Sequence, residues 1–293
     1  NVSAFGMTQT AEATGSGIII TNDGYILTNN HVVSSSDSSY YYQVSKAAKV
    51  TVSLYGSDEK YDATIIGTDE QTDLAIIKID ANNLTPAELG DSSSIKVGEF
   101  VLAIGNPLGL DTSVTSGIIS ALERDISTSD GTTYHVLQTD CAINSGNSGG
   151  ALVNSNGQVI GINTLKLSGT GIEGVGFAIP INDTIDVFEQ LIKHGKVLRP
   201  YIGISGSNLS ETTAQRYNLP VGIYVEDISE NSGASNSDLR KGDVITAADG
   251  QNITTMKELD AIKNAKEIGA TIRLTVYRSG NYLDIEITLT EMP

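Results

Sequence analysis

The sequence predicts a mainly β chain, with a barrel or a pair of barrels in residues 1–181 and a small α+β unit after them. Two observations predict this fold class. Many short runs of Val, Ile and Thr are separated by Gly, Asn, Asp and Ser, and only two segments show clear helical spacing. At 293 residues, the chain also has the length of two ordinary domains.

The strand-like runs are short throughout the chain. The first two flank Asn22-Asp23-Gly24, whose Asp-Gly pair is a strong hairpin signal. The further runs before residue 181 lie at 50–54, 62–67, 74–79, 99–104, 114–122, 134–139, 151–153, 158–165 and 175–179. After residue 200, the pattern restarts with runs at 201–205, 221–228, 243–248, 270–278 and 282–289.

Helical spacing marks the boundary between the two parts. In residues 182–196, apolar side chains recur every three or four positions, Asn182 or Asp183 can cap the start, and Gly195 can end the helix. A second helix fits Thr255–Ala265. The expected organisation is therefore a first domain at 1–181, a linking helix at 182–198 and a second domain at 199–293.

Composition excludes several classes of protein. The net charge of −17 argues against nucleic acid or an anionic membrane as partner. The single cysteine, Cys141, rules out an internal disulfide framework, and we expect it to be a small buried hydrophobe. No apolar run approaches the ~18 residues of a membrane span. The chain opens on Asn1 without an initiator methionine, so we expect a processed start, with any export signal or membrane anchor upstream.

The strongest chemical signal is Gly146-Asn147-Ser148-Gly149-Gly150. A serine attacks a carbonyl only when a base removes its proton and when donors already point at the developing oxyanion. Glycines let the backbone turn so that the amides of Gly146 and Ser148, with Asn147 as a further candidate, can meet beside the hydroxyl. Taken alone, the pentapeptide could equally be a glycine-rich hairpin turn.

A base must be one of three histidines. His31 is expected to end the strand Gly24–Asn30, at a strand edge, and is the best candidate. His194 falls in the last turn of the predicted linking helix, where a capping role fits better. His135 precedes the strand that leads to the serine and is a weaker candidate.

The third catalytic residue should be a buried carboxylate that orients the imidazole. Asp73 stands directly before the apolar run Leu74–Ile77, at the mouth of a buried strand. The resulting chain order of His31, Asp73 and Ser148 is that of chymotrypsin.

Five segments closely resemble the HtrA/Deg family of bacterial serine proteases: Thr28–Val33, Thr72–Ala75, Ala103–Gly109, Gln138–Leu152 and Gly174–Pro180. Their order and spacing match over almost the whole chain. The resemblance implies a chymotrypsin-like double β-barrel of six strands each, followed by a PDZ domain. It also implies cleavage of unfolded or misfolded proteins, a homotrimer, and a location in the periplasm or at the cell surface.

The same resemblance extends to substrate and regulatory residues. The strand after the serine would pair with the substrate backbone through Thr164 and Leu165, and Ile143 with Leu165 would border a pocket for small or medium aliphatic side chains. Arg124, expected in a polar loop at 123–131, takes the place of an arginine that transmits a regulatory signal.

The C-terminal part has its own motif. Tyr201-Ile202-Gly203-Ile204 resembles the loop with which the family's PDZ domains bind a chain-terminal carboxylate. Met256 and Leu259 are further candidates for the peptide pocket, although at least half of these apolar residues are expected to be core.

Two other functions stay open at this point. The chain could be mainly a quality-control chaperone, or a PDZ scaffold whose protease domain has been retired. The intact set of His31, Asp73 and Ser148 speaks against retirement. We expect no cofactor and no metal, because three scattered histidines and one cysteine form no zinc motif.

Overall fold

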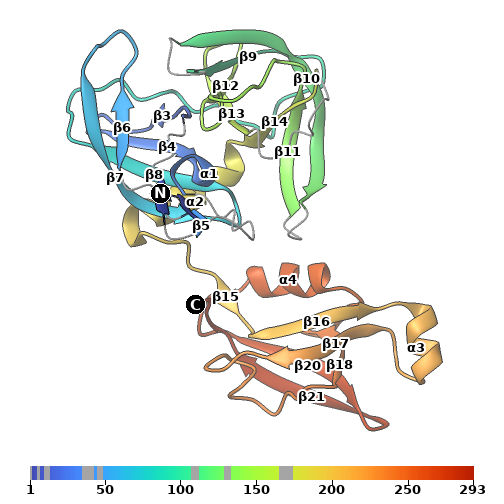
Figure 1. The fold of residues 1–293 in the computed structure, drawn as a ribbon. Helices are drawn as coiled ribbons and strands as arrows, with labels where there is room; N and C mark the ends of the chain where they lie inside the picture. Colours follow the sequence, from blue (N-terminus) through green and yellow to red (C-terminus); the bar gives the residue numbers. More distant parts are fainter. Residues whose placement is uncertain are drawn as a thin grey trace. The chain divides into compact units, whose positions relative to one another are not determined.

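The computed structural model describes residues 2–4, 7–9, 14–34, 43–44, 49–106, 112–128, 133–164 and 174–293. The chain divides into an N-terminal unit, Asn1–Val197, and a C-terminal unit, Leu198–Pro293 (Figure 1). Both are built mainly from strands, so the predicted fold class is confirmed.

The first half of the N-terminal unit contains an antiparallel sheet. Its strand order is β3-β4-β8-β7-β6, and β3 and β4 are joined by the predicted turn at Asn22-Asp23-Gly24. The resemblance implied a six-stranded barrel here, whereas the described residues give this sheet five strands. The strands are β3 (Ile18–Ile19), β4 (Tyr25–Asn29), β6 (Val50–Ser53), β7 (Lys60–Asp69) and β8 (Leu74–Ile79). A separate sheet contains β1 (Val2–Ala4), β2 (Met7–Gln9) and β5 (Gln43–Val44).

The second half of the N-terminal unit is a closed six-stranded barrel, in the order β10-β11-β14-β13-β12-β9. Its interior is filled by aliphatic side chains, and every residue of β13 is buried. The strands are β9 (Phe100–Gly105), β10 (Ser113–Ser127), β11 (Thr133–Thr139), β12 (Ala151–Asn154), β13 (Val159–Thr164) and β14 (Gly176–Pro180).

Helix α2 (Asn182–His194) confirms the predicted helix, but its start differs from the expected one. The side chain of Asn182 does not cap α2: it donates to Asp91 Oδ1 (2.7 Å) and accepts from the amide of Ser92 (3.1 Å). Gly195, with φ +72°, closes the helix by donating to the Leu191 carbonyl. The apolar face of α2 packs on the N-terminal unit, against β7, β8 and β14.

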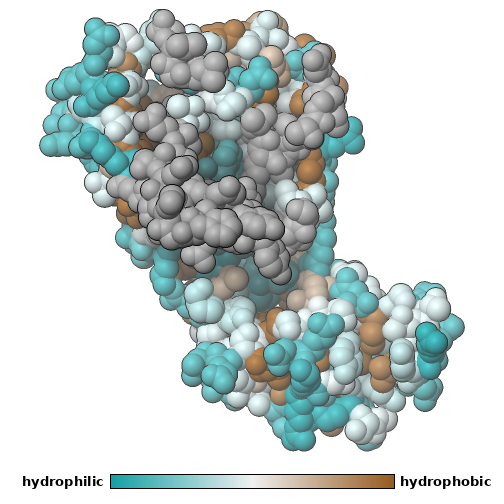
Figure 2. All heavy atoms as spheres, viewed as in Figure 1, coloured by the Kyte–Doolittle hydropathy of each residue, from teal (hydrophilic) through white to brown (hydrophobic). Residues whose placement is uncertain are grey.

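The C-terminal unit is one antiparallel sheet with a helix beside its first strand. The strand order is β16-β17-β18-β20-β21, so β16 and β21 are the edges of this sheet. On the face drawn in Figure 2, hydrophobic residues of this unit form small groups among hydrophilic ones. Its main strands are β16 (Ile204–Leu209), β17 (Gly222–Ile228), β18 (Val244–Ala248), β20 (Thr271–Arg278) and β21 (Asn281–Thr288). The short strands are β15 (Pro200–Tyr201), which pairs with β22 (Thr290–Glu291), and β19 (Gln251–Asn252), which pairs with β18.

Two helices belong to the C-terminal unit. Helix α4 (Met256–Asn264) matches the predicted second helix and begins with a capping box between Thr255 and Glu258. Helix α3 (Glu211–Tyr217) was not predicted, although Ser210 caps it by accepting from the amide of Thr213.

Candidate active site

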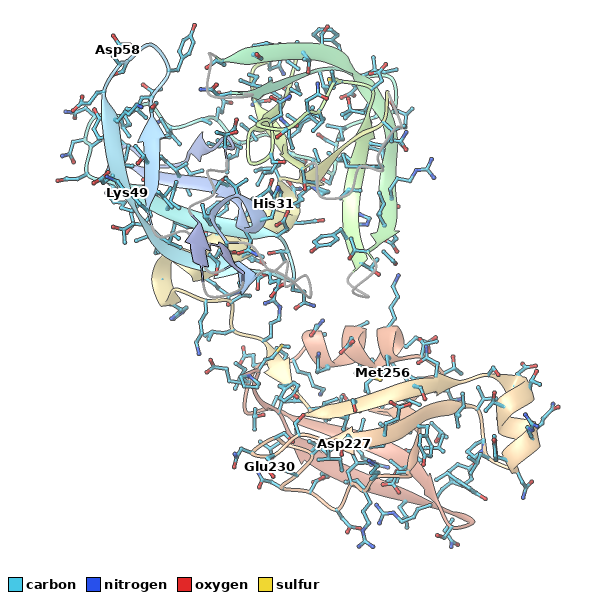
Figure 3. All side chains as sticks on the ribbon, viewed as in Figure 1. His31, Lys49, Asp58, Asp227, Glu230 and Met256 are labelled. Atoms are coloured by element: carbon cyan, nitrogen blue, oxygen red, sulfur yellow. The ribbon has the colours of Figure 1, made fainter. Side chains whose placement is uncertain are left out.

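His31 lies in α1 (Asn30–Val33), a single helical turn that directly follows β4. The expectation that His31 ends the strand is therefore wrong by a short distance. The reason is a long-range contact: the amide of Asn30 donates to the Asp73 carbonyl (2.9 Å), which turns the chain out of the sheet. His31 lies between the strands of the N-terminal sheet and those of the barrel (Figure 3).

Asp73 holds His31 through two bonds. His31 Nδ1 is 2.7 Å from Asp73 Oδ2, and the His31 amide donates to Asp73 Oδ1 at 3.0 Å. The Asp73 side chain is only 1% exposed, while 29% of the His31 side chain is exposed. A buried carboxylate thus fixes the Nδ1 edge of the imidazole, while the rest of the His31 side chain is partly exposed.

The backbone of Asp73 has φ +57°, in the left-handed region that Asp and Asn tolerate better than most residues. Asn29 Nδ2 donates to the Asp73 carbonyl (3.0 Å), and the hydroxyl of Thr164 donates to Asp73 Oδ2 (3.4 Å). Since Thr164 ends β13, the barrel also contacts this carboxylate.

Ser148 lies in the serine loop, which we define as residues 144–150 between β11 and β12. Gly146 and Gly149 have φ values of +100° and +82°, which favour glycine. The amide of Asn147 donates to the Asn144 carbonyl (3.0 Å), and the Gly150 amide donates to the Asn147 carbonyl (2.9 Å). Asn147 is thereby removed from the predicted oxyanion donors, because its N–H is used inside the turn. Gly146 and Ser148 stay candidates.

The serine loop packs against the segment that carries His31. The amide of Gly149 donates to the Asn163 carbonyl in β13 (2.9 Å), which ties the loop to the barrel. A Cβ added at Gly149 would collide with the side chain of Thr28 and would lie 3.1 Å from the backbone nitrogen of Asn29. Residues 28 and 29 come just before His31, so the fold brings all three predicted triad segments to one place.

The predicted substrate residues are placed less uniformly. Ile143 is buried at 9% exposure, and a Cβ added at Gly176 would lie 2.6 Å from its Cγ1. The side-chain hydroxyl of Thr164 donates to Asp73, and Thr164 is 1% exposed, so its side chain is a poor candidate for direct contact with substrate. Leu165 lies outside the described residues.

Cys141 is buried in the barrel core at 1% exposure. Burial raises the pKa of its thiol, which keeps the thiol protonated and unreactive. The expectation of a small buried hydrophobe is confirmed.

Arg124 lies within β10, directly after a bulge at Glu123 with φ +50°, and not in a loop as predicted. Its Nε donates to Gln138 Oε1 on the paired strand β11 (3.3 Å). Pairing with β11 up to Ser127 explains the difference, because this part of β10 is exposed and polar residues can therefore form the strand. The regulatory role of Arg124 stays a prediction.

The predicted peptide-binding residues surround the start of β16. The Tyr201 hydroxyl lies 2.7 Å from Ser229 Oγ. Gly203 has φ +90°, and its carbonyl accepts from the Ser229 amide. Ile202 and Leu259 are buried in the core of the C-terminal unit. Ile204 and Met256 are only partly buried, and Met256 lies on α4 beside β16 (Figure 3).

Within the described part of the chain, no group of three or more His, Cys, Asp or Glu side chains could hold a metal ion. None of the described helices is both long and apolar enough to cross a bilayer.

Comparisons with known proteins agree with this fold. Residues 15–162 match the model of the trypsin-like peptidase domain, and residues 200–289 match that of the PDZ domain. The chain is 43% identical over 292 residues to the serine protease Do-like HtrA of Lactobacillus helveticus, covering 94% of this chain and 68% of that protein. It is 41% identical over 286 residues to a probable periplasmic DegP-like serine endoprotease of Pseudomonas putida (strain W619), covering 97% and 57%.

A solved HtrA-type protease, AlgW with a decapeptide, superimposes with a TM-score of 0.82 at 36% identity, over 95% of this chain and 83% of that one. Fold and family models therefore define a trypsin-like peptidase domain followed by one PDZ domain. This chain belongs to the HtrA family of serine proteases. It spans between 57% and 68% of the length of the two curated relatives described above.

Sequence reasoning missed Ser16. Its hydroxyl donates to the Gly146 carbonyl, and its amide donates to the Ser148 carbonyl. No local pattern singles out one serine in a glycine-rich segment, because its partners lie about 130 residues away.

Proposed function

We propose that this chain is a serine endopeptidase that cleaves unfolded or misfolded polypeptides through an acyl-enzyme intermediate. The observation that carries the proposal is the buried Asp73 carboxylate bonded to His31 at 2.7 Å, beside a loop that holds Ser148. A buried carboxylate, an imidazole and a serine on a glycine-rich turn are the parts that acyl transfer requires.

The proposed reaction assigns one task to each group. The free nitrogen of His31 takes the Ser148 proton as the hydroxyl oxygen attacks the peptide carbonyl, and Asp73 stabilises the imidazolium that forms. The amides of Gly146 and Ser148 bind the oxyanion. Collapse of the tetrahedral intermediate breaks the C–N bond, and the departing amine takes the proton from His31. In deacylation, His31 takes a proton from water as the water oxygen attacks the acyl carbon. The ester bond to Ser148 then breaks, the Ser148 oxygen takes the proton back from His31, and the acid product leaves.

The pocket for the residue before the scissile bond should accept aliphatic side chains. Ile143 offers an apolar wall, and residues 142–148 contain no acidic group to pair with Lys or Arg. Digestion of unfolded casein, mapped by peptide mass spectrometry, should show cleavage after Val, Ile, Ala or Leu. Trypsin digestion of the same casein gives the reference pattern for basic residues. Cleavage that mainly follows Lys, Arg or Phe would contradict the proposed pocket.

The C-terminal unit is proposed to bind peptide C-termini along β16. This strand is an edge of its sheet, where an added peptide strand can pair. The amide of Met256 donates to Asn208 Oδ1 (2.8 Å), which holds the start of α4 against β16. The partly buried side chains of Ile204, Met256 and Ile262 supply apolar contacts for the last side chain of the peptide.

Binding of a fluorescent peptide that ends in a hydrophobic residue tests this assignment. Anisotropy titration should show at least tenfold weaker binding when the terminal carboxylate is amidated. The loop at 201–204 would then face a neutral amide in place of the negative charge that it is proposed to bind. Met256→Ser should weaken binding several-fold through lost apolar contact. Met292→Ser is the matched control, because Met292 is 49% exposed near the chain end. Equal affinity for the free and amidated peptides would rule out carboxylate recognition.

We also propose a homotrimer, as the family resemblance implies. The protease domain exposes a hydrophobic patch, defined as Val97, Phe100, Val114 and Ile118, on β9, β10 and the turn before β9. Phe100 and Ile118 are direct cross-strand partners, and Phe100 also borders a groove that contains Leu89 and Ile95. Exposed apolar patches of this kind usually mark interfaces. In sedimentation velocity, the wild type should run as a trimer and Phe100→Ser as a smaller species. A monomeric wild type would contradict the trimer.

An extracytoplasmic location belongs to the same proposal, at the bacterial cell surface or in the periplasm, since one relative is named periplasmic. Fractionation of the native host with an antibody against the chain would refute it by finding the protein in the cytoplasm.

A further inference from the structure

Ser16 uses every one of its hydrogen-bonding groups at the serine loop or directly beside it. Its hydroxyl donates to the Gly146 carbonyl and accepts from the Asn106 amide, both at 2.7 Å. Its amide donates to the Ser148 carbonyl (2.8 Å), and its own carbonyl accepts from the Thr28 hydroxyl (2.6 Å). Ser16 lies outside any helix or strand, just before β3.

The two carbonyls that Ser16 holds lie on either side of the peptide that carries the Ser148 amide. The peptide from Gly146 to Asn147 is fixed at both ends, because its carbonyl is bound by Ser16 and its N–H by Asn144. The peptide from Ser148 to Gly149 is fixed in the same way, by the Ser16 amide and by the Asn163 carbonyl. Neither peptide plane can rotate without losing two hydrogen bonds.

The sequence of the loop does not by itself select this orientation. Gly146 has φ +100° and no Cβ, so other backbone conformations are open to it at low cost. Hydrogen bonds within the loop hold one end of the Gly146–Asn147 peptide, and Ser16 holds the other end from outside the loop. An oxyanion donor contributes only when it is aimed at the oxyanion before the reaction starts.

The surroundings of Ser16 leave room for a serine side chain and for little more. A Cβ added at Gly105 would lie 3.0 Å from Ser16 Oγ, and one added at Gly150 would lie 3.1 Å from Ser16 Cβ. Backbone therefore flanks the Ser16 side chain on two sides and fits it closely.

We propose that Ser16 is a positioning residue for catalysis: its hydroxyl holds the Gly146 carbonyl and its amide holds the Ser148 carbonyl, and together they aim the Ser148 amide between them at the oxyanion. This role rests on the proposed proteolysis. A positioning role differs from a merely structural one in its kinetic effect. Loss of the Ser16 hydroxyl should weaken stabilisation of the transition state more than it weakens substrate binding.

Ser16→Ala tests the role in the full chain. We expect kcat on a peptide substrate to fall about 10- to 100-fold, while KM changes less than about twofold. This fall in kcat is no larger than the one that removal of an oxyanion donor itself would cause. Affinity for a peptide boronic acid, whose tetrahedral adduct on Ser148 mimics the oxyanion, should fall by a similar factor.

The matched control is Ser237→Ala. The Ser237 hydroxyl also bridges a carbonyl and an amide, those of Ala234 and Leu239, but in the C-terminal unit. It should lower thermal stability comparably to Ser16→Ala and leave kcat and boronate affinity unchanged. If Ser16→Ala does not fold, Ser16→Cys, which is only slightly larger than serine and has a weaker donor, should show the same pattern.

The outcomes are distinct. Suppose that the wild type cleaves casein and that Ser16→Ala (or Ser16→Cys in its place) equals it in kcat and boronate affinity. This result overturns the role of Ser16 and leaves the proposed proteolysis standing. A change in KM or thermal stability without loss of kcat also overturns that role. A wild type that neither cleaves casein nor binds the boronate overturns the proposed proteolysis itself.

Discussion

Replacing Ser148 by alanine is expected to reduce cleavage of unfolded casein by about 10⁶-fold, below detection in an ordinary assay. The members of a triad act as a unit, so without the nucleophile no acyl-enzyme can form. Folding should be unaffected, since the change removes one small hydroxyl at 4% exposure and leaves the loop glycines in place. Casein digestion and reaction with a fluorophosphonate probe would both measure the loss.

The matched control is Ser53→Ala, which removes an exposed hydroxyl at the end of β6 and should keep wild-type activity. Ser148→Ala should still bind a C-terminal peptide as the wild type does. Residual cleavage above one per cent of wild type would contradict the assignment of Ser148. If the wild type prevents aggregation of unfolded proteins but cleaves none of them, the chaperone alternative is favoured instead.

The elements that the sequence predicts best are those whose signal is local. Residues 74–79 are bounded by Asp73 and Asp80 and form β8 at the predicted positions, because an aliphatic run broken only by Lys78 fits a strand buried on both faces. Helix α2 follows from helical apolar spacing and from Gly195, whose left-handed conformation ends it. Asp73 could be placed at the mouth of β8 for the same reason.

The features that the sequence does not predict depend on partners far away in the chain. The turn of α1 at His31 is set by Asp73, which lies 42 residues later. Asn182 looks like a helix cap, yet its side chain bonds to Asp91, 91 residues earlier. Glu123 gives no local sign of the bulge that places Arg124 in a strand. Such contacts decide between conformations that local propensity leaves nearly equal in energy.

Replacing Asp73 by asparagine should lower kcat by about 10⁴-fold while preserving the fold, because the same exchange in a chymotrypsin-type triad has that effect. The introduced amide would accept from the His31 backbone N–H through its oxygen and present its NH₂ group to His31 Nδ1. That contact favours the tautomer with the proton on Nε2, which cannot then accept the Ser148 proton. The φ of +57° is no obstacle, since asparagine also tolerates the left-handed region.

The matched control for that prediction is Asp69→Asn, a carboxylate of the same turn that is 7% exposed and bonded to Thr72. It tests whether loss of any buried charge near β8 disables the enzyme. We expect Asp69→Asn to lose stability but to keep kcat within a few-fold of wild type, while Asp73→Asn keeps its thermal transition and loses turnover. If both variants lose activity equally, or if Asp73→Asn stays within tenfold of wild type, His31 is not oriented by Asp73 in the way the 2.7 Å contact indicates.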